Sequence, residues 1–278
     1  MVIETVRDTP AHNPSEFDTI VLSIERATEA ASESKPSRGS NSVATITLYR
    51  PEALNAITVA MLAELRTALD IVSADPSISV VVITGAGRAF SAGVDLKSLE
   101  GAPLEGGAVG DLLDLPAREV SDRILGLEAV VIAKVNGFCF TGALELILMC
   151  DVVVAADEAV FGDTHAKWGL RPSWGMSQRL PRAVGPARAR YLSYTATTFS
   201  GKDAAAWGLA ALSVPRANLD TVVADMASSI ASHSRGALLA YKDLYRIADS
   251  TPMPEGLAYE SSTTYPIDDT EIRIAQFR

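Results

Sequence analysis

One short segment combines glycines with a carboxylate in a way that suits chemistry on a carbonyl group. It reads NGFCFTGALE at residues 136–145 and lies between a β-branched stretch ending at Val135 and an apolar run at 146–150. A helix that begins near Gly142 would leave its first N–H groups without intrahelical partners, and such donors suit an oxygen that develops negative charge. Glu145 would lie in the first helical turn, close enough to move protons. The segment therefore predicts oxyanion stabilisation beside an acid or base.

The competing interpretation is that Glu145 only stabilises the N-terminus of its own helix. Thr141 and Glu145 are four residues apart, whereas a capping box needs a spacing of three. The spacing weakens this interpretation without removing it, and the local sequence leaves both open.

A second turn of small residues follows another buried-type strand pattern, VVVIT at 80–84. It reads FSAGVDLK at 90–97, and the backbone N–H of Ala92 could face a ligand there. The carboxyl ends of parallel strands lie on the side where α/β sheets bind ligands. One donor from each turn, on Ala92 and Gly142, would form an oxyanion hole for a thioester enolate. Glu145 would then supply the acid–base function.

Other common catalytic patterns do not fit this chain. Gly85-Ala86-Gly87 follows a strand pattern, but Phe90 stands where a dinucleotide-binding fingerprint needs its third glycine. Walker, HExxH, CxxC and G-x-S-x-G patterns do not occur. The three histidines, His12, His165 and His233, are far apart in sequence, which argues against a metal site.

Composition narrows the class of protein further. The chain has 278 residues, is 48% hydrophobic and carries a net charge of −10, which argues against a nucleic-acid partner and against binding to anionic membranes. No apolar run approaches the roughly 20 residues of a membrane span, and no signal-peptide pattern is evident. Cys139 and Cys150 lie in apolar stretches and indicate reduced thiols. We expect a cytoplasmic protein.

The elements that must position these residues alternate along the chain. Thr58 is expected to cap a helix that Asp75-Pro76 ends, another helix is expected after Pro116, and the part beyond Pro186 is expected to be helical. The predicted strands are 19–25, 43–48, 80–84, 130–135 and 151–156, and the predicted helices include 58–74, 187–194, 219–232 and 236–248. Short β-branched runs that alternate with helices predict an α/β protein with parallel strands and crossover helices.

The expected organisation has one large core. Residues 1–17 are polar and predict a flexible N-terminus, residues 18–215 form the core, and residues 216–278 form a C-terminal helical region. Within the core, residues 27–42 contain five serines and no large apolar side chain. They predict a loop or insertion.

Four motifs, in this order, resemble the crotonase (enoyl-CoA hydratase/isomerase) superfamily over about residues 43–215. They are RPEALNA at 50–56, VITGAGRAFSAGVDL at 82–96, VNGF through Glu145 at 135–145, and QRLP at 178–181. The resemblance implies a crotonase-like spiral of ββα turns with a C-terminal trimerisation region, and a homo-oligomer, either trimer or hexamer. It places the oxyanion hole on Ala92 and Gly142 and a catalytic carboxylate on Glu145. It also implies that the acyl-CoA thioester is bordered by Ala53, Leu54, Ala56, Ser91, Ala92, Val94, Asp95, Leu96, Lys97 and Gly142.

The chain departs from its relatives near the second catalytic position. In similar hydratases a second glutamate follows Phe-Gly, but here the stretch reads FGDTH and places His165 at that position. His165 is either an acid or base near neutral pH or a structural, hydrogen-bonded histidine. Asp163 is a further candidate, but its offset on an extended segment is expected to point it the other way. Thr141 replaces a glycine, and Trp174 is a candidate for the acyl pocket.

The leading functional prediction is an enoyl-CoA hydratase, a lyase of fatty-acid β-oxidation type that adds water to a trans-2-enoyl-CoA. Glu145 would activate the water, and His165 would supply or orient the second proton. A Δ3–Δ2 enoyl-CoA isomerase with one base is the first alternative, and an acyl-CoA-binding protein with little catalysis is the second. None of these needs a metal or a cofactor besides the coenzyme A of the substrate.

Overall fold

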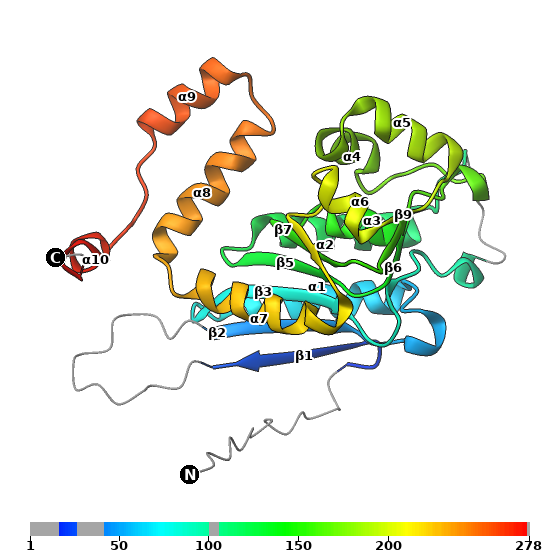
Figure 1. Cartoon of the computed structure of the whole chain (residues 1–278), viewed down its shortest axis with the longest axis horizontal. Coiled ribbons are helices and arrows are strands. Elements are labelled where there is room, and N and C mark those ends of the chain that lie inside the picture. Colours follow the sequence, from blue (N-terminus) through cyan, green and yellow to red (C-terminus); the bar gives the residue numbers. More distant parts are fainter. Residues whose placement is uncertain (1–16, 27–41, 100–105, 277–278) are drawn as a thin grey trace, which may run out of the picture.

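Two β-sheets lie at the centre of the molecule, with helices around them (Figure 1). The computed structural model describes residues 17–26, 42–99 and 106–276. Within these residues the larger sheet has the strand order β1-β2-β3-β5-β7-β10, and the smaller sheet has the order β4-β6-β8-β9. The larger sheet consists of β1 (Ile20–Glu25), β2 (Ser42–Leu48), β3 (Ile78–Gly85), β5 (Val130–Val135), β7 (Val152–Ala156) and β10 (Leu212–Val214). The smaller sheet consists of β4 (Ala89–Ser91), β6 (Phe138–Phe140), β8 (Val160–Gly162) and β9 (Phe199–Ser200).

Most neighbouring strands run parallel, as the alternating pattern predicted. Only the outer pairs β1–β2 and β8–β9 are antiparallel among the described strands. The chain adds one strand to each sheet in turn, β3 then β4, β5 then β6, β7 then β8, with helical segments after each pair. This is the expected spiral of ββα turns. It stacks the connections that follow β4, β6 and β8 beside one another.

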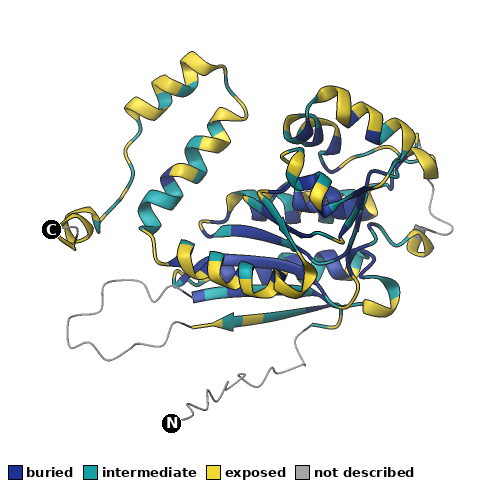
Figure 2. Ribbon diagram, viewed as in Figure 1, coloured by how far each residue is buried: buried dark blue, intermediate teal, exposed yellow. Residues whose placement is uncertain are grey.

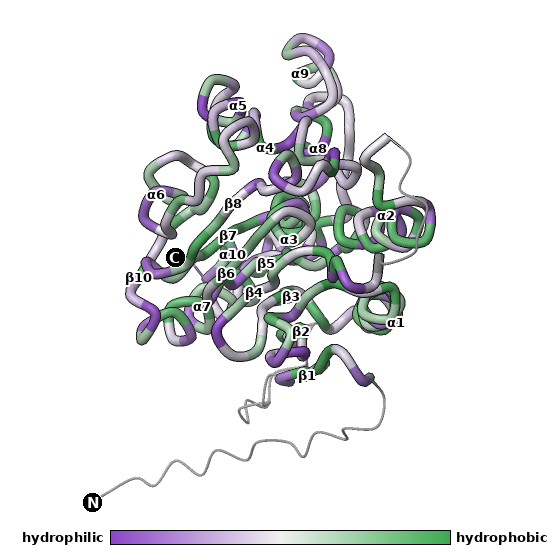
Figure 3. The backbone as a smooth tube through the Cα atoms, turned by 90° about the vertical axis from the view of Figure 1, so that its right-hand side faces the viewer, coloured by the Kyte–Doolittle hydropathy of each residue, from purple (hydrophilic) through white to green (hydrophobic). Residues whose placement is uncertain are grey.

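The core explains why these segments became strands and helices. Every residue of β3 is buried, as expected for a β-branched strand covered on both faces. Helix α1 (Val59–Ala74) buries its stripe of Met61, Leu65 and Leu69. The predicted cap is present, because Thr58 Oγ1 accepts a hydrogen bond from Met61 N at 3.2 Å. Figure 2 shows the buried residues concentrated in the sheets and inner helices, and Figure 3 shows that these segments are also the hydrophobic ones.

The remaining helices surround the smaller sheet and one face of the larger one. Helix α7 (Arg216–Ala231) packs against β2, β3, β5 and β7. The others near the site are α2 (Asp111–Gly126), α3 (Gly142–Ile147), α4 (Met176–Val184), α5 (Pro186–Thr195) and α6 (Gly201–Ala206), with short 3-10 helices η1 (Pro51–Ala53), η2 (Leu96–Leu99) and η3 (Ala166–Trp168).

Three expectations about elements were wrong in detail. Helix α2 begins at Asp111 and continues through Pro116, because two acidic residues in the first turn and a buried apolar stripe outweigh one lost backbone hydrogen bond. The short strands β9 and β10 lie where only helices were expected, since two or three residues carry no periodic signal. Ser42 belongs to β2, while residues 1–16 and 27–41 of the predicted flexible segments lie outside the described residues.

The last three helices extend away from the sheets (Figure 1). The first of them is mostly half-buried, and the other two are largely exposed (Figure 2). They are α8 (Arg235–Ala248), α9 (Met253–Ser262) and α10 (Thr270–Gln276). Helix α8 is held to the body by Arg235, whose Nη1 donates to Ile78 O at 2.8 Å, and by Lys242, whose Nζ donates to Asp151 Oδ2 at 2.9 Å. Among the described residues, no helix is long and apolar enough to cross a membrane.

Candidate active site

Glu145 lies in the first turn of α3 and is almost completely buried, with 2% of the residue exposed. Its Oε1 accepts hydrogen bonds from the backbone N–H groups of Trp174, at 2.9 Å, and Met176, at 3.0 Å. Both donors come from the segment that leads into α4, so the carboxylate does not cap its own helix. Glu145 therefore makes no capping hydrogen bond within α3, although it remains an acidic residue in the first turn of that helix. The other oxygen, Oε2, faces His165 Nε2 at 3.6 Å.

The environment of Glu145 changes how it titrates. Burial raises the pKa of Glu145 above its ordinary value, and the N–H groups of Met176 and Trp174 together with nearby His165 offset only part of that effect. A buried carboxyl with a raised pKa exchanges protons closer to neutral pH. That property suits a residue that must accept a proton in one step and donate one in another.

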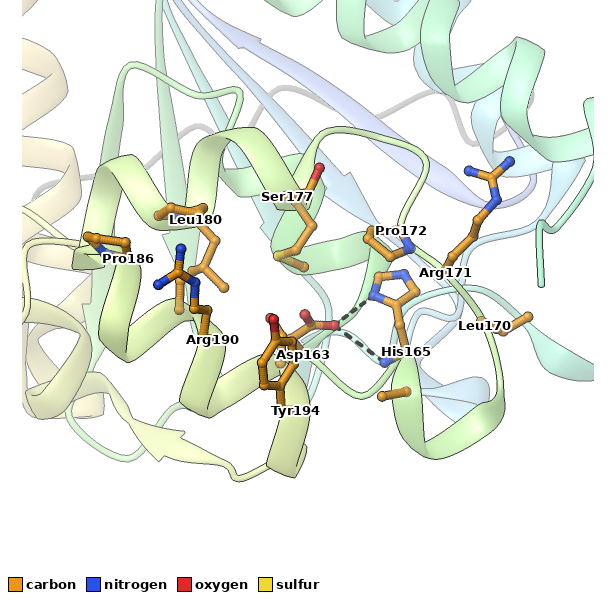
Figure 4. Close-up of a pocket in the computed structure, with 15 residues that line it drawn as sticks. Asp163, His165, Leu170, Arg171, Pro172, Ser177, Leu180, Pro186, Arg190 and Tyr194 are labelled. Carbon is orange, nitrogen blue, oxygen red and sulfur yellow. Dashed lines mark hydrogen bonds and ion pairs between the residues drawn. The ribbon is translucent and has the colours of Figure 1, made fainter. Parts of the chain in front are cut away.

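His165 follows β8 and forms a buried pair with Asp163 (Figure 4). Its Nδ1 lies 2.7 Å from Asp163 Oδ1, and its backbone N–H donates to the same oxygen at 3.3 Å. Burial alone would raise the pKa of Asp163, but hydrogen bonds from His165 and Ser193 outweigh it and hold the pKa below its ordinary value. Asp163 is therefore an ionised partner for the imidazole.

The expectation that Asp163 points away from His165 was wrong. The two residues are two positions apart, and on an extended segment such residues lie on the same side. The spacing in FGDTH was thus the signal that could have revealed this pair. The structure brings three groups into one row, with the carboxylates of Asp163 and Glu145 on the two sides of the His165 ring.

The backbone N–H of Ala92 is already engaged within the protein. It donates to Leu54 O at 2.9 Å, which leaves it unable to serve as the predicted oxyanion donor in this conformation. The N–H of Gly93 donates to Ser91 Oγ at 3.1 Å and that of Asp95 donates to Ile57 O at 2.9 Å. Among the described residues, the N–H of Val94 has no acceptor. Of the N–H groups from Ala92 to Asp95, it is therefore the one left for a ligand.

Close packing of glycines brings this turn against the other one. Gly93 has φ +86°, and a Cβ there would overlap Thr141 Oγ1 and lie 2.6 Å from Phe140 O. Gly93 and Thr141 immediately precede Val94 and Gly142, so the two amides that follow them are neighbours. The Gly142 N–H also has no acceptor in the part of the chain that the structure describes. Two backbone donors therefore adjoin each other near the buried Glu145.

A buried asparagine, not singled out in the sequence, holds the loop that begins after β2. Asn55 has no exposed surface. Its Nδ2 donates to Ala86 O at 2.9 Å and Ala89 O at 2.8 Å, and its Oδ1 accepts from Arg50 N at 2.9 Å. These three hydrogen bonds use both N–H donors of the side-chain amide and one of the two lone pairs on its oxygen. The loop is thus fixed to the segment between β3 and β4.

An ion pair ties the same loop to the turn that carries Val94. Arg50 Nη1 lies 3.1 Å from Asp95 Oδ2 and donates to Ala56 O at 2.6 Å. The structure therefore brings together the two groups of residues predicted to border the substrate. One group is Ala53, Leu54 and Ala56. The other group is Ser91, Ala92, Val94, Asp95, Leu96 and Lys97. In the second group, Leu96 and Lys97 are exposed at the start of η2.

Trp174 packs directly on the backbone of Gly142. A Cβ added to Gly142 would lie 2.6 Å from Trp174 Cζ3, so the indole ring occupies the space that any other residue would need. The ring is anchored on its far side, because Nε1–H donates to Asp114 Oδ1 at 2.9 Å. Ser173 Oγ donates to the same oxygen at 2.7 Å. Trp174 thus forms a wall that joins α2 to α3.

A cavity of about 450 Å³ adjoins the His165–Asp163 pair on the side of α4 and α5 (Figure 4). Its walls are mostly apolar, and Arg171, Arg190 and Tyr194 contribute polar groups. Glu145 and the two glycine turns are not part of its lining, so His165 lies between the cavity and the carboxylate. Within the described residues no cluster of His, Cys, Asp and Glu has three members that could hold a metal ion.

Comparison with known proteins connects this geometry to one family. The profile of the family described as enoyl-CoA hydratase/isomerase matches residues 38–273. The chain is 35% identical over 205 residues to a probable peroxisomal enoyl-CoA hydratase of Arabidopsis thaliana, covering 74% of this chain and 75% of that protein. It is 35% identical over 218 residues to a probable enoyl-CoA hydratase of Mycobacterium tuberculosis, covering 78% and 83%.

Solved structures that resemble this chain come from the same family. An enoyl-CoA hydratase/carnithine racemase from Magnetospirillum magneticum superposes with a TM-score of 0.80 at 30% identity, covering 94% of this chain and 93% of that one. An enoyl-CoA hydratase from Bacillus anthracis superposes with a TM-score of 0.75 at 33% identity, covering 79% and 84%.

Proposed function

This chain belongs to the enoyl-CoA hydratase/isomerase family, and from that premise we propose that it adds water reversibly to a trans-2-enoyl-CoA. The observation that carries this proposal is the pair formed by Glu145 and His165, whose Oε2 and Nε2 atoms are 3.6 Å apart. Hydration needs one group to take a proton from water and a source of a proton for the α-carbon. Two titratable side chains at this separation supply both.

The thioester carbonyl is bound by two backbone N–H groups in this mechanism. Val94 and Gly142 donate to the carbonyl oxygen, and Val94 takes the place first assigned to Ala92. Electron density moves onto that oxygen as the enolate forms, so fixed donors stabilise the transition state more than the ground state. Each such donor contributes about 10²- to 10³-fold in rate.

The attacking water is held beside the pair. Because Oε2 and Nε2 are 3.6 Å apart, a water at about 2.8 Å from each atom completes a triangle with ordinary hydrogen-bond lengths. Glu145 removes a proton from this water while its oxygen bonds to the β-carbon and the double-bond electrons move to the thioester oxygen. The enolate then collapses, and the α-carbon takes a proton from the protonated pair of Glu145 and His165. One water is added, and both side chains return to their starting states.

A Δ3–Δ2 isomerase is the alternative, because Glu145 alone could carry a proton across an allyl system. Incubation with crotonyl-CoA and, separately, a 3-enoyl-CoA in ¹⁸O-labelled water distinguishes the two. A hydratase forms 3-hydroxyacyl-CoA with ¹⁸O at the β-carbon. Conversion of the 3-enoyl substrate to the 2-enoyl product without ¹⁸O would instead assign the isomerase. Binding of both thioesters without turnover would assign an acyl-CoA-binding protein.

Trp174 forms the wall of the acyl pocket in this proposal. Its ring contacts Gly142, one of the two donors to the thioester, and it is fixed by Asp114. The acyl chain leaves the thioester close to that position, so the indole limits the space available to it. The residues at 53–56 and 91–97 border the coenzyme A part.

We also propose a homo-oligomer, trimer or hexamer, built through the C-terminal helices. Large apolar side chains lie exposed on α8, α9 and α10, namely Tyr241, Tyr245, Met253, Leu257, Ile272 and Ile274, each at least 57% exposed. Exposed apolar surface on this scale is characteristic of contacts between proteins. Light scattering coupled to size exclusion checks this, and a monomer at micromolar concentration would contradict it.

A further inference from the structure

We propose that Asp163 is a positioning residue that keeps a proton on His165 Nδ1 and thereby turns the Nε2 atom of His165 toward Glu145. The catalytic part of this inference rests on the proposed hydratase function. The structural part, which nitrogen of His165 carries the proton, does not depend on it.

The contacts of Asp163 fix both the ring and the backbone of His165. One oxygen, Oδ1, lies 2.7 Å from Nδ1 and 3.3 Å from the backbone nitrogen of the same histidine. The shorter distance is typical of a charge-assisted hydrogen bond. Asp163 and His165 are only 3% and 8% exposed, so water competes little for these bonds. Ser193 on α5 lines the same cavity as Asp163, so a separate helix packs against this segment.

The identity of the acceptor decides the tautomer. A neutral imidazole has one N–H and one bare nitrogen, and an ionised carboxylate can only accept. The proton of neutral His165 therefore lies on Nδ1, between the ring and Asp163. Nε2, at 3.6 Å from Glu145 Oε2, is then the bare nitrogen, available to accept a proton from water or from Glu145. The opposite tautomer would present an N–H to the water and could not accept that proton.

Charged groups face His165 from several elements. Glu145 faces it from α3, and Asp163 faces it from its own segment. Arg171 and Arg190 line the adjoining cavity together with Tyr194. Asp163 is the closest of these groups to the ring, so its replacement should affect His165 more directly than a change at any of the others.

The test replaces Asp163 by Asn and observes His165 directly. The chain has three histidines, so ¹⁵N-histidine labelling with His12→Gln and His233→Gln variants assigns the His165 signals. We expect Nδ1–H in the wild type and a loss of that tautomer in Asp163→Asn. On the same protein, kcat should fall about 100-fold with KM nearly unchanged, and the pH profile of kcat should change.

Asp151→Asn is the matched control. Asp151 is also a hydrogen-bonded carboxylate, with Val131 N at 2.7 Å and Lys242 Nζ at 2.9 Å, but it lies outside the site. This variant should lose stability while kcat and the pH profile stay as in the wild type. A purely structural Asp163 would behave in the same way as this control.

Several outcomes would overturn the proposal, and they separate it from the proposed function. An Nε2–H tautomer in the wild type refutes it even if Asp163→Asn fails to fold. An unchanged pH profile and kcat in a folded Asp163→Asn variant also refutes it while leaving the hydratase intact. If the wild type shows Nδ1–H and the variant loses it, yet neither hydrates crotonyl-CoA, the positioning role stands and the proposed function fails.

Discussion

Replacing Glu145 by Gln should separate catalysis from folding, because the contacts of this residue divide between its two oxygens. Oε1 accepts the N–H groups of Trp174 and Met176 at 2.9 and 3.0 Å, and a glutamine oxygen can keep both bonds. The change falls on the other side, where an NH₂ group replaces Oε2 beside His165. The variant therefore retains its fold but cannot take a proton from water.

The expected loss of rate follows from the role assigned to Oε2. General acid–base catalysis contributes about 10²- to 10⁴-fold, which corresponds to roughly 3–5 kcal/mol in the barrier. We expect kcat to fall by at least ~100-fold. Acyl-CoA binding should change little, because its donors at Val94 and Gly142 are backbone groups.

Although Glu145→Gln should lower the rate, it should raise the stability of the folded protein at neutral pH. Because burial raises the pKa of Glu145, the folded state binds this proton more tightly than the unfolded chain. The stabilising contribution is complete below the unfolded pKa, about 4.3, and is lost as pH rises through the raised folded pKa. At neutral pH the ionised Glu145 therefore costs stability, and Glu145→Gln should melt at a higher temperature than the wild type. This advantage should shrink as the pH is lowered toward 4.

The assay combines initial rates of enoyl-CoA hydration with melting temperatures between pH 4 and 8. Glu64→Gln is the control, because Glu64 also accepts a backbone N–H, from Thr19 at 2.8 Å, but lies on α1 away from the site. It should keep the wild-type kcat. A near-normal rate for Glu145→Gln would remove Glu145 from the mechanism. A melting temperature below that of the wild type at every pH would show that its charge supports the fold instead.

Three further variants test other parts of the site. Asn55→Ala removes one partner from three hydrogen bonds that are buried or partly buried. It should lower the free energy of unfolding by about 3 kcal/mol and raise KM. A loss below about 1 kcal/mol in denaturant titration would contradict this role. Thr141 adopts φ +46°, a strained backbone for a β-branched residue that costs about 1–3 kcal/mol. Thr141→Gly should therefore raise the melting temperature by a few degrees, and a decrease would refute the strain argument. Trp174→Ala should raise the ratio of kcat/KM for longer acyl chains to kcat/KM for shorter ones by about tenfold, which corresponds to about 1.4 kcal/mol of relieved crowding. An unchanged chain-length preference would place the acyl chain elsewhere.

Local sequence determined the elements with strong periodic signals. Helix α1 with its Thr58 cap was predicted because its apolar residues repeat with the helical period, and the buried strands β3, β5 and β7 were predicted because each is a short β-branched run. The start of α2 and the strands β9 and β10 were not, because a short strand or a tolerated proline depends on what packs around it. The order of motifs also determined the family and the positions of Glu145 and His165, since both are properties of the chain as written.

Only the tertiary structure decided how those residues can act. Whether Ala92 or Val94 offers a free N–H depends on Leu54 O, which reaches Ala92 from a loop 38 positions earlier in the chain. Glu145 is oriented by amides 29 and 31 residues away, and its raised pKa comes from burial by many segments at once. Hydrogen-bond partners and desolvation arise from groups that meet only after folding. The sequence therefore identified the candidate acid and base, and the fold determined which groups surround them.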